Sequence, residues 1–127
     1  QQTFAEVSFE HYRKATRREQ FLDAMNRVVP WAELVAVVEP VYPKAEGPGR
    51  PPVGIERMLR LHCLQQWFNL SDPAVEEALY DSRAMRQFVG IDLGREPVPD
   101  ETMICKFRHL LKLTGWASNS LHESGSI

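Results

Sequence analysis

The sequence predicts an all-α protein, a compact bundle of five to six short helices with a helix-turn-helix-like C-terminal part. Three observations lead to this prediction. Apolar residues recur at helical spacing in several segments. Capping residues, prolines and glycines stand where those segments begin and end. No segment shows the strict apolar and polar alternation that is typical of a half-buried strand.

Two helices are expected in the N-terminal third. Thr16 and Glu19 have the spacing of a capping box, in which each side chain bonds the backbone N–H of the other residue. The apolar positions that follow are Phe21, Leu22, Met25, Val28 and Val29. Pro30 should end this helix, because proline cannot donate a backbone hydrogen bond. The next apolar stretch, WAELVAVVEPVYP, suits a second short helix.

A strongly amphipathic helix is expected over residues 55–68, with Asn69 as its stop. Asp72 is predicted to cap the next helix, and Pro73 suits the first helical position. A short helix should then end at Gly90, where glycine tolerates the left-handed backbone of a helix end.

The last helix is predicted to begin after Asp100 and to carry its apolar stripe on one face. The stripe consists of Met103, Ile104, Phe107, Leu110 and Leu111. Beyond this helix the period is lost, and Ser, Gly, Asn and Thr accumulate. We therefore predict one helical domain over residues 1–111 and a disordered tail over residues 112–127.

Composition limits the classes of function. The chain has 127 residues and a formal net charge of −2, so contact with nucleic acid would need a local basic patch. No apolar run approaches the ~20 residues of a membrane span, and no signal peptide is visible, so we expect a cytoplasmic protein without membrane contact. Cys63 and Cys105 have no CxxC spacing and are expected to be two buried thiols in a reducing compartment.

No catalytic pattern is present in the sequence. The four histidines lack metal-ligand spacing, and there is no Walker loop, GxSxG or GxGxxG motif. His62 lies beside an apolar stripe and is expected to be a core or boundary histidine. We therefore expect no enzyme activity, no cofactor and no metal.

The C-terminal helices offer candidate DNA contacts. Between residues 83 and 112 there are six basic and four acidic side chains, Arg108 among the basic ones. Thr102, Lys106 and His109 share one face of the last helix, which in a helix-turn-helix would enter the major groove. The alternative is a solvated outer face of an ordinary bundle.

Two further segments carry candidate DNA contacts. Arg17 and Arg18 belong to a basic cluster at the start of the first helix, where they oppose the helix dipole and suit an external anion such as phosphate. Arg50 lies within GPGRPPVG, where an extended backbone could carry it into a narrow minor groove. The same prolines equally well stiffen a simple hinge.

The motifs GRPP, LQQWFNLSDPAVEEALYDS, and PDET followed by FRHLL closely resemble the amino-terminal domain of bacterial transposases of the insertion-sequence-five family. The resemblance covers about residues 1–111. It implies an α-helical domain that recognises terminal inverted repeats and helps to assemble subunits. It also implies a later ribonuclease-H-like domain with a DDE carboxylate triad and two divalent metal ions. No triad motif occurs in these 127 residues.

The resemblance ends after Leu111, where the family continues like E-A-H-x-L-G-x-x-L-F. A single inserted base can restore this continuation from LKLTGWASNSL, so we infer that a one-base deletion shifted the reading frame. The sequence thus predicts a truncated transposase fragment that binds DNA and self-associates. The partners expected for self-association are further copies of this chain or full-length transposase subunits. The alternatives are a pure self-association module, using the apolar faces of residues 55–68 and 103–111, or a remnant without function.

The frameshift hypothesis predicts a result at the level of the gene. Sequencing should reveal a shifted transposase reading frame downstream of the stop codon. A gene without that frame would refute the deletion.

Overall fold

The computed structural model describes residues 14–43 and 53–115 and shows a bundle of α-helices. These residues contain no strand, so the predicted all-α fold is confirmed. The helices in chain order are α2 (Arg17–Val28), α3 (Trp31–Val38), the short 3-10 helix η1 (Glu39–Val41), α4 (Ile55–Phe68), α5 (Asp72–Asp81), α6 (Arg83–Val89) and α7 (Glu101–Thr114).

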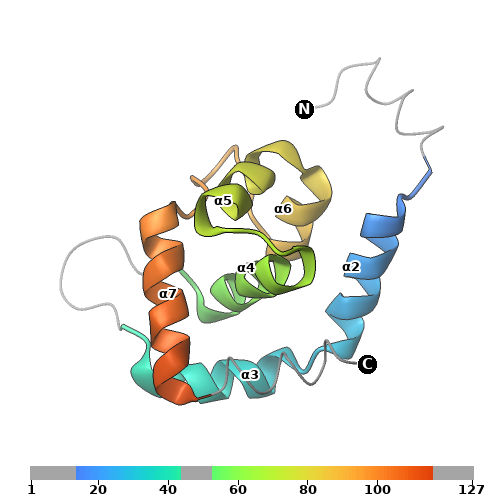
Figure 1. The fold of residues 1–127 in the computed structure, drawn as a ribbon. Helices are drawn as coiled ribbons and strands as arrows, with labels where there is room; N and C mark the ends of the chain where they lie inside the picture. Colours follow the sequence, from blue (N-terminus) through green and yellow to red (C-terminus); the bar gives the residue numbers. More distant parts are fainter. Residues whose placement is uncertain (1–13, 44–52, 116–127) are drawn as a thin grey trace.

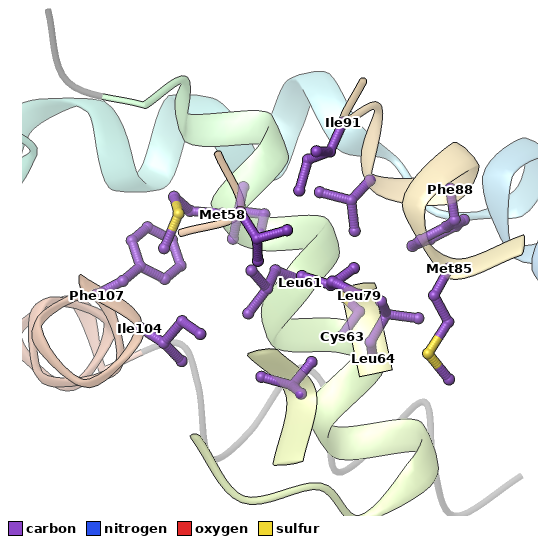
Figure 2. Packing of buried hydrophobic residues seen from close by; sticks show 14 of the residues in the cluster. Met58, Leu61, Cys63, Leu64, Leu79, Met85, Phe88, Ile91, Ile104 and Phe107 are labelled. Atoms are coloured by element: carbon purple, nitrogen blue, oxygen red, sulfur yellow. The ribbon is translucent and has the colours of Figure 1, made fainter. Parts of the chain in front are cut away.

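Helix α4 is the centre of the bundle. It packs against α3, α5, α6 and α7. Its buried residues include the unbroken run Leu61, His62, Cys63, Leu64 and Gln65. Five consecutive residues exceed the ~3.6 residues of one helical turn, so α4 is covered around its whole circumference. Figure 2 shows the α4 side chains interlocked with apolar side chains of the surrounding helices.

The other helices form a frame around α4. Figure 1 shows α2 and α7 on opposite sides of the bundle, with α3 along one edge between their ends. Helix α5 contacts both α6 and α7, whereas α2 packs against α6. The N-terminal and C-terminal helices are therefore held in place by the middle of the chain.

Aromatic side chains attach α2 and α3 to the rest of the bundle. The ring of Phe21 in α2 meets Trp67 edge-on, with ring centroids 5.3 Å apart. Trp31 of α3 meets Phe88 of α6 in the same way, at 5.8 Å. The guanidinium of Arg60 lies over both of these last rings, 4.3 Å from Trp31 and 5.1 Å from Phe88. Such contacts combine apolar burial with cation–π attraction.

Most helix ends follow the predicted local signals. Thr16 and Glu19 form the capping box of α2. Asn69 ends α4 in the left-handed region with a φ of 54°, and Gly90 ends α6 with a φ of 90°. Asp100 caps α7 by accepting a hydrogen bond from the backbone N–H of Met103.

Two boundaries differ from the prediction. Ser71, not Asp72, caps α5, because its hydroxyl accepts a hydrogen bond from the N–H of Ala74 at 3.2 Å. Asp72 is the first helical residue, and its carboxylate is turned towards other helices. Helix α7 also continues to Thr114 and ends at Gly115, so residues 112–114 of the predicted tail are helical. The remainder of that tail lies outside the described residues.

A capping variant tests the corrected start of α5. Replacement of Ser71 by Ala should lower the free energy of unfolding by about 1 kcal/mol, because it removes the acceptor for the Ala74 N–H. Ser71→Gly should cost only a few tenths of a kcal/mol, since glycine is tolerated at this position. Urea denaturation measures both variants, and an unchanged stability of Ser71→Ala would contradict the assignment.

Candidate nucleic-acid interface

The predicted DNA-contact residues fall on two separate surfaces. Four of them belong to α7, and Arg17 and Arg18 lie in the first turn of α2. These two helices stand on opposite sides of the bundle (Figure 1). Arg50 lies outside the described residues. The fold therefore does not bring the whole predicted set together.

The face of α7 that points away from the core carries three of the predicted residues. Ile104, Phe107 and Leu111 are buried and fix the inner face of this helix. Thr102, Lys106 and His109 are exposed. Because the inner stripe is anchored in the core, the outward direction of the exposed stripe is fixed as well.

Arg108 is directed differently from the other predicted residues of α7. Its guanidinium Nη2 donates a hydrogen bond to the Oδ2 of Asp72 at 2.6 Å, which joins α7 to the start of α5. The other carboxylate oxygen of Asp72 accepts a hydrogen bond from Gln65 of α4 at 2.8 Å. The bond from Arg108 lowers the pKa of the Asp72 carboxyl and raises the pKa of the guanidinium. Arg108 thus connects three helices.

Carboxylates occupy the start of α7. The Oδ1 of Asp100 accepts a hydrogen bond from the N–H of Met103 at 2.9 Å. The Oε1 of Glu76, from α5, accepts a hydrogen bond from the N–H of Glu101 at 2.9 Å. Thr102 stands between these two bonded N–H groups. Two of the backbone donors that would otherwise suit a phosphate at this helix N-terminus are therefore already bonded to protein carboxylates.

The arginines of α2 are exposed at the opposite side of the bundle. The guanidinium of Arg18 lies 5.4 Å from the centre of the Phe68 ring. Glu19 in the same turn accepts a hydrogen bond from the N–H of Thr16 at 3.0 Å. This carboxylate suits the positive end of the helix dipole, so it offsets the unfavourable placement of the arginines.

The described residues on either side of the GPGRPPVG segment lie next to α7. The hydroxyl of Tyr42 donates a hydrogen bond to the carbonyl of Val53, which joins the two flanks of the segment. The Tyr42 ring also meets Phe107 of α7 edge-on, with centroids 6.0 Å apart. The chain therefore leaves and re-enters the described fold beside α7.

The buried titratable groups belong to the core. His62 is 3% exposed, as a core histidine was predicted to be. Burial lowers its pKa to about 4, and the nearby Arg108 acts in the same direction. Cys63 is a buried free thiol whose pKa burial raises to about 12. Cys105 is also free but only partly buried, so the prediction of two buried thiols is confirmed for Cys63 alone.

A cavity of about 220 Å³ lies between α2, α4 and α6. Its polar lining includes Glu19, Asp23, Asn26, Arg60 and Gln87. It involves no residue of α7. Among residues 14–43 and 53–115, no three His, Cys, Asp or Glu side chains are grouped so that they could hold a metal ion. In that same part of the chain, every helix is too short or too polar to cross a membrane.

Comparison with known protein families gives one result that covers most of the chain. The family model described as a transposase domain (DUF772) matches residues 9–110. This span contains six of the helices described above and the two candidate surfaces. No solved structure matches the chain significantly.

The position of Arg108 predicts a structural effect. Arg108→Ala should lower the free energy of unfolding by about 1–2 kcal/mol, because Asp72 loses a charged partner in a half-buried site. Lys106→Ala removes an exposed cation from the same helix and should change stability by less than about 0.5 kcal/mol. A double-mutant cycle with Asp72→Ala isolates the pair, and the absence of coupling between the two positions would contradict its role.

Burial of His62 predicts a pH dependence of stability. The unfolded chain protonates this ring near pH 6.5, whereas the folded protein does so only near pH 4. Between these values the unfolded state binds more protons, so stability should fall by about 2–3 kcal/mol as the pH drops from 6.5 to 4. His62→Gln should flatten the curve in this window. Urea denaturation at successive pH values measures both proteins, and identical slopes would contradict the assignment.

Proposed function

The chain belongs to the DUF772 transposase-domain family, and we propose that it is a DNA-binding and self-association module that recognises the terminal inverted repeats of an insertion sequence. The observation that carries this proposal is the outward face of α7. Lys106 and His109 stand there on a helix whose opposite side is locked into the core. A rigid helix with a lysine and a histidine on its exposed side suits the major groove of DNA.

The order of the C-terminal helices supports a helix-turn-helix-like use of α7. Helices α5 and α6 and a loop precede α7, in the order that the sequence predicted. Helix α5 packs against both α6 and α7, so it connects the last helix to the helix before it. In this proposal α7 is the recognition helix. The proposal that the chain belongs to the insertion-sequence-five family in particular rests on the sequence motifs.

The arginines of α2 form a second candidate surface for phosphates. Arg17 and Arg18 are exposed and lie on the side of the bundle opposite to α7 (Figure 1). We assign base recognition to α7 and contact with phosphates to the α2 arginines.

We propose binding without strand cleavage for residues 1–127. Phosphoryl transfer by two metal ions needs a constellation of carboxylates, and the sequence contains none of the motifs of the DDE triad. A domain of this kind would occupy inverted repeats or join full-length subunits.

A gel shift with terminal-repeat DNA tests the proposal. The purified chain should retard a duplex that carries the repeat more strongly than a shuffled duplex, and rising salt should weaken the complex because counterions are released from phosphates. Unchanged mobility at low salt would discard DNA binding. Strand cleavage by the purified chain in magnesium, with contaminating nucleases excluded, would refute the proposed lack of chemistry.

Paired variants separate the two surfaces. The double variant Lys106→Ala with His109→Ala should reduce the preference for the repeat over the shuffled duplex, since it removes side chains that reach base edges. Arg17→Ala with Arg18→Ala should weaken binding to both duplexes about equally and lower the salt slope by about 2. The reverse result would exchange the roles of the two surfaces.

A pure self-association module is the second candidate, and exposed apolar side chains favour it. Val28, Val37 and Leu113 are 70%, 43% and 73% exposed. They belong to α2, α3 and α7, and Figure 1 shows α3 along one edge of the bundle, between the ends of α2 and α7. The face of residues 55–68 that was expected to be available is instead enclosed by the other helices. Light scattering decides, because a particle of constant mass with and without DNA would favour this alternative.

A further inference from the structure

We propose that duplex DNA lies against the part of α7 that follows its first turn, with Lys112 as a phosphate contact, and that the first turn itself stays away from phosphates. The inference rests on the proposed DNA-binding function and specifies which part of the helix performs it. It adds Lys112 to the contact residues and removes Thr102 from them.

The first turn of α7 lies in an acidic environment. Asp100 and Glu101 begin the helix, and the carboxylate of Glu76 is bonded to its first N–H group. The neighbouring helix α5 has four acidic residues and no basic one in its sequence DPAVEEALYD. A phosphate that approached Thr102 would therefore meet several carboxylates of the same sign of charge, and the backbone N–H groups of Glu101 and Met103 are already engaged.

The part of α7 that follows its first turn has the opposite character. From Thr102 to Gly115 the sequence contains Lys106, Arg108 and Lys112 and no acidic residue. Arg108 is paired with Asp72, which leaves the two lysines as the exposed cations of this stretch. They are separated by six positions, or about 9 Å along the helix axis, and His109 stands midway between them. These three side chains form one stripe that complements the charge of a phosphate backbone.

Acidic residues at the start of a helix and basic residues near its end also stabilise the helix dipole. This alternative explains the charge pattern without DNA. The two explanations differ in what the loss of Lys112 changes, because a dipole role affects the stability of the folded chain and a phosphate contact affects the salt dependence of DNA binding.

Fluorescence anisotropy with a labelled terminal-repeat duplex, recorded over a series of salt concentrations, tests the inference. Lys112→Ala should lower the slope of log affinity against log salt by about 1. Thr102→Ala should bind like the unaltered chain. Arg95→Ala removes a cation from the exposed loop before α7 and serves as the control for a general loss of charge. Lys112→Arg should retain the slope.

Urea denaturation of the same variants shows that each is folded under the binding conditions. A loss of affinity in Thr102→Ala, together with unchanged binding by Lys112→Ala, would overturn the inference and leave the DNA-binding function in place. An equal loss in Lys112→Ala and Arg95→Ala would overturn it as well. Absence of binding by the unaltered chain would instead overturn the proposed function and, with it, the inference.

Discussion

Burial of α4 on all sides is the constraint that the other helices satisfy together. A helix with five consecutive buried residues cannot be covered by one neighbour, so α3, α5, α6 and α7 must surround it. Each large apolar side chain that leaves water stabilises the fold by about 1.5–3 kcal/mol. Helix α4 contributes more buried apolar side chains than any other described helix. The buried polar residues of this helix must therefore bond to other protein groups or remain uncharged. Gln65 bonds to Leu70 and Asp72, and His62 remains neutral.

The packing of the helices around α4 also affects which basic side chains remain exposed for binding. Several arginines connect helices or loops across the bundle, as the multiple donors of a guanidinium allow. Arg57 pairs with Glu96, Arg60 bonds to Glu56 and to the carbonyl of Phe88, Arg86 bonds to the carbonyls of Leu79 and Tyr80, and Arg108 pairs with Asp72. A count of charges along the sequence includes these groups, although they serve the fold. On α7 the exposed cations are Lys106 and Lys112.

Local signals explain why the helices could be predicted and why some details could not. The capping box at Thr16 and the stop at Gly90 depend on residues within a few positions, so they are visible in the sequence. Asp72 resembles a cap locally, yet its partner Arg108 is 36 positions away, and only the packing of α5 on α7 brings them together. In the same way, the exposed stripe of α7 follows from its period. The carboxylate of Glu76 at its start comes from a position 25 residues earlier, and no local pattern indicates it.

The small number of available cations connects DNA binding with self-association. In the proposed function, the two exposed lysines of α7 neutralise few phosphates, so one copy of this chain of net charge −2 gains little electrostatic affinity through that helix. Two linked copies on two sites would gain far more, because the second contact becomes intramolecular. The exposed side chains of Val28 and Val37 belong to α2 and α3, outside the helix that carries Lys106, His109 and Lys112, so contact between copies through them would leave that stripe available. In the proposed function, assembly therefore supplies the affinity that the single domain lacks, and the two activities are parts of one mechanism.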